Sequence, residues 1–258
     1  MHFAFLGTSG AVPSLERDTT SLVFVGRRES VLVDCGGSPV QKLLHAGVDP
    51  ATLTRVIITH IHPDHAYGLP SLIQSLFLMG RTDPLGVCCR EEHVGPLRAL
   101  LGLFELLERP GLFPIPFEGV PAREGAPVAT TPSFAFTASP NAHGRMPNLA
   151  LRVDAPALGR AVVYSSDTEP CEAVAALARG ADTLIHEATF AERGRGRFGA
   201  HSTAGDAGAV AARAGVRRLI LTHIDPEYHG EVEAMAAEAR ARFAGTVEIS
   251  REFVPYPL

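Results

Sequence analysis

Several features are scarce in this chain of 258 residues, and each scarcity excludes a class of protein. The four cysteines show no CxxC spacing, which predicts buried reduced thiols rather than a disulfide framework or a cysteine zinc site: Cys35, Cys88, Cys89 and Cys171. No apolar run approaches the roughly 20 residues that cross a bilayer. The N-terminus, MHFAFLGTSG, lacks the basic start of a signal peptide. We therefore expect a cytoplasmic protein without a membrane partner.

Basic residues are also in the minority. Lysine and arginine number 23 against 28 acidic residues, which gives a net charge of −5. Proteins that bind nucleic acid through its phosphates usually carry a dense basic patch. The longest basic cluster, ERGRGR at residues 192–197, is typical of a flexible solvated loop. No strong nucleic-acid-binding surface is expected.

Apolar residues make up 46% of the chain, enough for a sizeable core. Short apolar runs bounded by glycine, aspartate and proline predict strands at residues 2–6, 21–25, 30–34, 54–59, 134–138, 149–153, 161–164, 183–186 and 217–222. Helical spacing predicts helices at residues 40–46, 69–79, 91–108, 171–179, 203–214 and 231–243. The first half is rich in strands and the second alternates strand with helix. This order predicts an α/β fold with two packed sheets and outer helices. No linker or repeat divides the chain, so one domain over residues 1–258 is expected.

The strongest chemical signal is the segment Thr59–His65, THIHPDH, which directly follows an apolar strand. If the backbone is still extended there, His60 and His62 point to the same side. Asp64 and His65 then come from the following turn and suit a second metal ion nearby. Imidazole and carboxylate donors are typical zinc ligands, with iron or manganese as less frequent alternatives.

These four residues cannot complete two coordination spheres, so further ligands must come from other segments. Asp167 and His223 end the apolar strands AVVYSSD and RLILTH, and His143 lies in the loop SPNAHGRMPN. A carboxylate such as Asp167 could bridge two cations and offset their repulsion. His201 precedes a predicted helix, where Ser202 or Thr203 is the candidate cap and His201 only its neighbour.

These motifs together resemble the metallo-β-lactamase superfamily and, more narrowly, its ribonuclease Z branch. The matching segments run through nearly the whole chain: FLGTSGAVPS, ITHIHPDHAYGLPSL, VVYSSDTEPCEA, LIHEATFAE, AHSTAGDAGAVAARAG and LILTHID. The resemblance implies a four-layer αββα sandwich and a hydrolase with two zinc ions. It assigns one zinc to His60, His62 and His143, the other to Asp64, His65 and His223, and the bridge to Asp167.

The resemblance also implies catalytic roles. Asp64 could accept a proton from the attacking water, and His201 matches the histidine that steadies the developing charge or protonates the leaving oxygen. Glu187, in HEATF, is expected to support the metal-bound imidazoles from behind. Relatives of this branch form dimers, so a homodimer is a further expectation, for which the helix at residues 69–79 could provide a face.

The chain departs from the ribonuclease Z pattern in the segment between His143 and Asp167. The glycine- and proline-rich arm that grips transfer RNA in that family is absent there, and Glu227 stands where the family has arginine. These departures favour a small or cyclic phosphodiester, or an RNA end, as substrate. A lactonase, an arylsulfatase-like enzyme or another ester hydrolase is the alternative. A non-catalytic metal-stabilised scaffold is disfavoured, because structural zinc sites are usually closed four-ligand cages.

Overall fold

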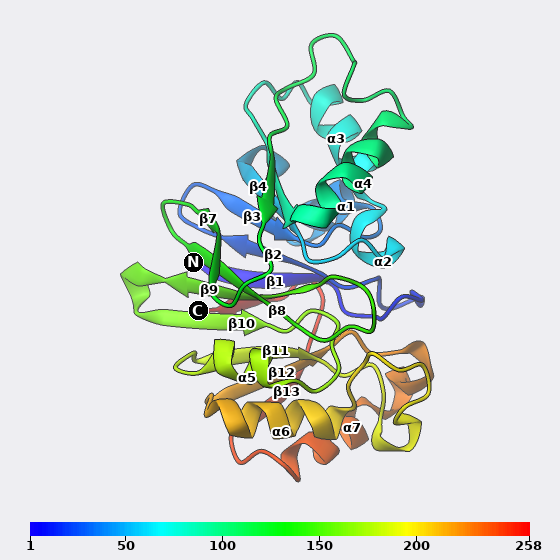
Figure 1. The fold of residues 1–258 in the computed structure, drawn as a ribbon, viewed down its shortest axis with the longest axis vertical. Coiled ribbons are helices and arrows are strands. Elements are labelled where there is room, and N and C mark those ends of the chain that lie inside the picture. The colour runs from blue at the N-terminus through cyan, green and yellow to red at the C-terminus, as the bar shows by residue number, and fades with distance from the viewer.

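Two seven-stranded sheets pack face to face, and each carries helices on its outer side (Figure 1). The computed structural model describes residues 1–258. The first sheet has the order β14-β1-β2-β3-β4-β5-β6. Its strands are β1 (His2–Gly7), β2 (Ser21–Val25), β3 (Ser30–Val33), β4 (Leu53–Ile58), β5 (Gly86–Arg90), β6 (Phe117–Val120) and β14 (Pro255–Pro257).

The second sheet repeats this plan with the order β13-β12-β11-β10-β9-β8-β7. Its strands are β7 (Ala126–Thr130), β8 (Ala135–Pro140), β9 (Leu149–Ala155), β10 (Arg160–Tyr164), β11 (Thr183–Glu187), β12 (Arg218–Thr222) and β13 (Thr246–Ile249). In both sheets antiparallel strands occupy one part and parallel strands the other: β3 to β6 are parallel in the first sheet, and β10 to β13 in the second.

Helices from the two halves of the chain cover opposite outer faces (Figure 1). The first sheet is covered by α1 (Pro39–His45), α2 (Pro63–Ala66), α3 (Leu69–Leu78) and α4 (Glu91–Gly102). The second is covered by α5 (Glu172–Ala178), α6 (Ala204–Ala214) and α7 (Val232–Arg240). None of these helices has both the length and the apolar composition needed to span a bilayer.

The alternation of side chains along each strand builds three apolar layers. On β1, Phe3 and Phe5 enter the cluster between the sheets, whereas Ala4 and Leu6 pack under the first set of helices. On β12, Ile220 faces the other sheet. Since successive strand residues point to opposite faces, a strand that is apolar throughout must be covered on both sides. The four-layer αββα sandwich follows, as predicted.

The structure corrects several sequence-based boundaries. The helix predicted over residues 91–108 is wrong in its last turns, because α4 ends at Gly102. Glu105 has a φ of +53°, which no α-helix accommodates, and Leu103 is 80% exposed although it continues the leucine spacing. Strands β5, β6, β7, β13 and β14 were not predicted. The cysteines are free, with Cys171 only half-buried and the others buried as expected.

The fold places several loops at one edge of the two sheets. Parallel strands all end at the same edge, and ligand sites in α/β folds form in the crevice outside these carboxyl ends. Strands β4, β10 and β12 end there and are soon followed by His60, Asp167 and His223. Glu187 is the last residue of β11. Residues far apart in the chain therefore meet at this edge.

Candidate metal centre

The THIHPDH segment turns sharply from β4 into α2. His62 is the residue before the helix, and Pro63 takes the first helical position, where its fixed φ and missing N–H are tolerated. The single turn of α2 then carries Asp64 and His65. His60 and His65 are fully buried, while His62 is half-buried. The expected pairing of the first two histidines is present, with 3.0 Å between His60 Nε2 and His62 Nδ1.

Three other loops deliver the remaining predicted residues to this place. His143 follows β8, Asp167 follows β10, and His223 follows β12. His223 has a φ of +57° and Ser166, beside Asp167, a φ of +52°. Non-glycine residues rarely adopt such values, and strained backbone of this kind tends to occur at functional sites. The structure thus brings all seven predicted metal-binding side chains together.

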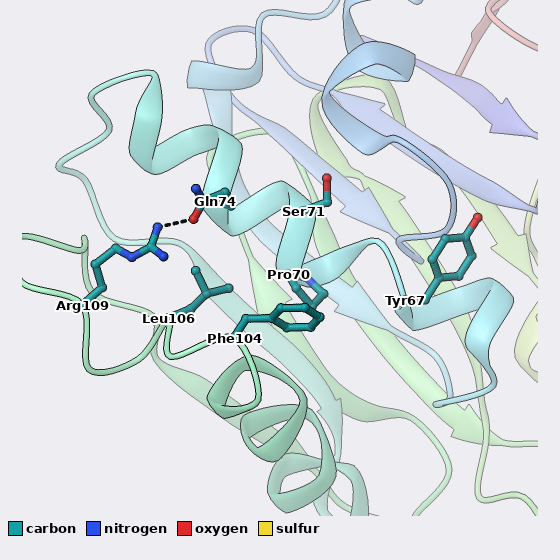
Figure 2. Close-up of a pocket in the computed structure, with 7 residues that line it drawn as sticks. All are labelled: Tyr67, Pro70, Ser71, Gln74, Phe104, Leu106 and Arg109. Atoms are coloured by element: carbon teal, nitrogen blue, oxygen red, sulfur yellow. Dashed lines mark hydrogen bonds between the residues drawn. The ribbon is translucent and has the colours of Figure 1, made fainter.

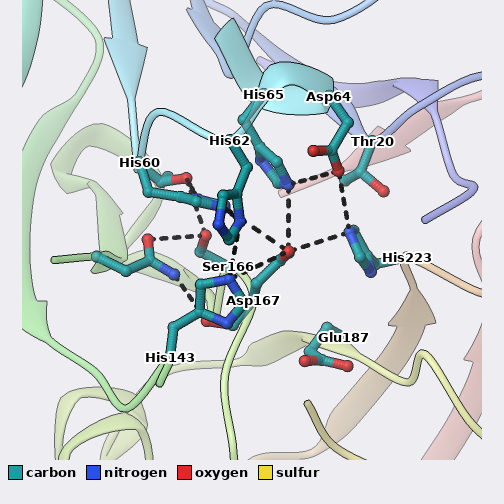
Figure 3. A network of polar contacts seen from close by, with 12 residues as sticks. Thr20, His60, His62, Asp64, His65, His143, Ser166, Asp167, Glu187 and His223 are labelled. Carbon is teal, nitrogen blue, oxygen red and sulfur yellow. Dashed lines mark hydrogen bonds and ion pairs between the residues drawn. The ribbon is translucent and has the colours of Figure 1, made fainter. Parts of the chain in front are cut away.

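These side chains form two groups that share Asp167 (Figure 3). In the first group, His143 Nε2 lies 3.1 Å from His62 Nδ1, and Asp167 Oδ2 lies 3.8 Å from His60 Nε2. In the second group, Asp167 Oδ2 lies 3.3 Å from His65 Nε2 and 3.2 Å from His223 Nε2. Asp64 completes that group, with its Oδ2 3.3 Å from His65 Nε2 and 3.6 Å from His223 Nε2.

The donor atoms of both groups fit divalent cations. Asp167 Oδ1 is buried and makes no hydrogen bond, and His65 Nε2 and His223 Nε2 meet only carboxylate oxygens, at 3.2 to 3.6 Å. Buried polar atoms without a partner are costly, and a cation between them would remove that cost. In the first group three imidazole nitrogens converge, and burial is the main cause that lowers the pKa of His60 and of His62. Neutral imidazoles offer the lone pairs that a metal requires.

In the second group, the carboxylates favour protonation of the two imidazoles at which a cation would bind. Burial alone would lower the pKa of His223, but the charge of Asp167 raises it to about 10. The pKa of His65 is likewise raised well above its usual value by Asp167 and Asp34, against the effect of burial. Burial would raise the pKa of Asp64, yet its contacts with His223 and His65 hold it far below the usual range. A bound cation would displace the two imidazole protons and leave the carboxylates ionised.

Three of the five histidines are also oriented from behind by a second contact. The Nδ1 of His65 lies 2.9 Å from the buried carboxylate of Asp34, and the Nδ1 of His143 lies 2.8 Å from the carbonyl oxygen of Ala200. Thr189 Oγ1 lies 2.9 Å from His223 Nδ1. Such contacts on the far nitrogen set the tautomer and direct the other nitrogen toward the metal.

Asp34 is the functional residue that the sequence reasoning missed. It accepts hydrogen bonds from the backbone N–H and hydroxyl of Thr59 at 2.8 and 2.9 Å, besides its contact with His65. The signal was available, since Asp34 follows the apolar strand β3 as Asp167 follows β10. Its φ of +60° ends the strand one residue earlier than expected.

Glu187 lies near the centre (Figure 3), with its carboxylate and the ring nitrogens of His201 and His223 within 4.8 Å of one another. Its Oε1 is 2.8 Å from His201 Nδ1, and its Oε2 accepts a hydrogen bond from the Thr189 hydroxyl, which in turn contacts His223. Burial would lower the pKa of His201, but the charge of Glu187 raises it above its usual value. The carboxylate therefore favours the charged form of His201 beside the centre. Thr203, and not His201, caps α6.

The arginines of the ERGRGR stretch are exposed to solvent, as expected, and ion pairs connect all three of them to carboxylates. Arg193 Nη1 lies 3.0 Å from Glu227 Oε1, and Arg197 pairs with the same carboxylate. Arg195 contacts Asp206 at 2.8 Å and Glu192 at 2.9 Å. Glu227 thus anchors this loop rather than facing the centre.

Two surface hollows differ in their relation to the centre. One of about 450 Å³ is lined by residues of the centre itself, including His62, His143 and His201. The other, of about 410 Å³, lies between α3 and the segment after α4 (Figure 2), and neither a histidine nor a carboxylate lines it. Its lining includes Tyr67, Phe104 and Arg109. Only the first hollow can admit a substrate to the centre.

Comparisons with known proteins agree with this geometry. A family model described as "Beta-lactamase superfamily domain" matches residues 29–224. A ribonuclease Z of Methanothermobacter thermautotrophicus is 34% identical, covering 95% of this chain and 93% of the relative. One of Methanosarcina mazei is 32% identical, covering 99% of each. The metallo-β-lactamase fold protein YhfI of Bacillus subtilis has a TM-score of 0.82 at 25% identity, covering 99% of this chain and 98% of that one. Human tRNase Z, short form, has a TM-score of 0.81 at 24% identity over the whole of both chains.

Proposed function

The chain belongs to the metallo-β-lactamase superfamily and within it to the ribonuclease Z family, and on that premise we propose that it is a phosphodiesterase that binds two zinc ions. The observation that supports this most directly is the convergence of seven donors in two groups that share Asp167. The first ion would be held by His60, His62 and His143 and the second by Asp64, His65 and His223. The histidine-rich donor sets favour zinc over manganese or iron.

Both halves of the chain contribute to this centre. His60 to His65 belong to the first sheet and its helices, whereas Asp167 and His223 follow strands of the second. Neither half holds a complete donor group. We propose that residues 1–258 act as one hydrolase domain.

The chain's own residues can move the two protons that hydrolysis requires. Zinc ions bound here would activate a water molecule and stabilise negative charge on the phosphoryl group. The Asp64 carboxylate lies at the centre, with its Oδ2 3.3 Å from His65 Nε2, so it is placed to accept a proton from the attacking water. Glu187 contacts His201 at Nδ1 and favours its protonated form, so the opposite nitrogen, Nε2, can donate a proton to the leaving oxygen.

The proposed acid, His201, favours phosphodiesters as the substrate class. An alkoxide leaves a phosphodiester poorly, so an acid aimed at the leaving oxygen contributes most there. Between His143 and Asp167 the chain forms only β9 and β10, joined by the short turn Pro156–Leu158. A small or cyclic phosphodiester, or an RNA end that docks without an arm, fits this centre.

The test couples metal content to hydrolysis. We expect His62→Ala and Asp167→Ala to lose bound zinc and to abolish hydrolysis of bis(p-nitrophenyl) phosphate, because each removes a donor. His45→Ala, at an exposed histidine that ends α1, is the matched control and should keep both properties. Unchanged metal content in the first two variants would refute the ligand assignment. Hydrolysis of lactones or aryl sulfates but of no phosphodiester would replace the proposed reaction.

A further inference from the structure

The hollow beside the metal centre is bordered by two loops. Residues 143–147 follow β8, and residues 198–201 precede α6. Three of the lining residues, His62, His143 and His201, belong to the centre or touch it. The volume of about 450 Å³ lies within the roughly 300–1,000 Å³ that small-molecule sites occupy. A group attached to a phosphate at the centre can therefore extend into this hollow.

An exposed aromatic side chain, Phe198, lies at this hollow. Its side chain is 72% exposed, although large apolar residues are usually buried. Phe190 supports the ring at 6.0 Å between centroids, and the Arg197 guanidinium lies 5.5 Å from the ring centroid. The pairing of Arg197 with Glu227 anchors the adjoining backbone. The ring is thus supported in place while most of its surface stays open.

The backbone beside Phe198 is also under constraint. Gly199 and Ala200 have φ values of +60° and +57°. For Ala200 this conformation is unfavourable, and it places the carbonyl oxygen 2.8 Å from His143 Nδ1. The loop that carries Phe198 is therefore connected to a proposed metal ligand, so the ring is placed relative to the centre.

We propose that this hollow is a base-binding subsite in which Phe198 stacks on the nucleobase of the substrate. The inference rests on the proposed phosphodiesterase function and specifies its substrate as a nucleotide. Stacking on an aromatic ring is the usual way to hold an unpaired base. Arg145, exposed on the other bordering loop, forms no ion pair and adds a cation near the substrate.

The lining also predicts how selective the subsite is. No asparagine, glutamine, serine, threonine or carboxylate side chain lines the hollow. Every base has a π-face, whereas reading its edge requires polar side chains in register. We therefore expect purine and pyrimidine nucleotides to bind with similar affinity.

The test compares two nucleotides with a sugar phosphate that lacks the base. Binding of AMP, UMP and ribose 5-phosphate to the zinc-loaded protein is measured by calorimetry. We expect the wild type to bind both nucleotides about 5- to 100-fold more tightly than ribose 5-phosphate, as loss of one base stack implies. Phe198→Ala should reduce this preference to about twofold or less, and Phe198→Tyr should retain it.

Phe104→Ala is the matched control, because Phe104 is also an exposed phenylalanine but lines the other hollow (Figure 2). It should keep the wild-type preference. An unchanged preference in Phe198→Ala, or none in the wild type, would overturn the subsite. If phosphodiesters are hydrolysed but Phe198→Ala binds AMP normally, the subsite alone fails. If the preference depends on Phe198 but no phosphodiester is hydrolysed, the proposed function alone fails.

Discussion

The contact between Asp34 and His65 gives the sharpest prediction about the centre. Asp34→Asn keeps the size of the side chain, and asparagine tolerates the φ of +60° at this position. The amide oxygen can still accept the two hydrogen bonds from Thr59. The amide nitrogen then faces His65 Nδ1 across 2.9 Å, where the carboxylate had accepted a proton. Two donors cannot share that contact, so His65 must turn or change its tautomer.

The loss of this orientation of His65 is expected to lower the affinity for zinc. Removing a partner behind a metal-bound histidine weakens metal binding by about 10- to 100-fold, or ~1.4–2.8 kcal/mol. Zinc affinity is measured by competition with a chromogenic chelator, and circular dichroism confirms that the protein is folded. Asp154→Asn, on β9 and paired with Arg152, is the control and should bind zinc normally. A folded Asp34→Asn protein that binds both zinc ions with wild-type affinity would refute the reasoning.

Three further outcomes are expected. His201→Ala should retain its zinc but turn over alkyl phosphodiesters about 10²- to 10⁴-fold more slowly, because a general acid is lost; metal analysis beside steady-state kinetics tests this, and an unchanged rate would remove the acid role. Thr203→Ala removes the cap of α6 and its reciprocal bond with Asp206, so the free energy of unfolding should fall by ~1 kcal/mol. Tm should then fall by about 2–4 °C, and an unshifted melting curve would contradict the role of this cap. Zinc affinity should rise with pH, because the His223 proton, with a pKa of about 10, must leave before the metal binds; equal affinity at about pH 6 and about pH 8 would contradict this competition.

Much of the fold was readable from local patterns. Apolar runs bounded by turn residues located β1 to β4 and β8 to β12, because each strand must present apolar side chains to both of its faces. The same reasoning missed β5, although GVCCR is fully buried. It also extended α4 beyond Gly102, because leucine spacing continues past the point where the backbone turns. The spacing of apolar residues indicates which residues favour burial, but it does not indicate where the chain changes direction.

For the centre, the residue types and their positions after strands singled out the candidate donors, whereas the full ligand set and the place of His201 came from the resemblance to the ribonuclease Z branch. Local order covered only His60 and His62, because side chains two positions apart in an extended segment point to the same side. The contacts behind those donors could not be obtained in this way. Asp34 meets His65, Glu187 meets His201, and Phe198 meets the hollow only because two sheets pack with their carboxyl edges aligned. Glu187 and His201 are 14 positions apart in the chain, Asp34 and His65 are 31 apart, and His143 and Ala200 are 57 apart. Only the register and packing of the sheets bring such residues together.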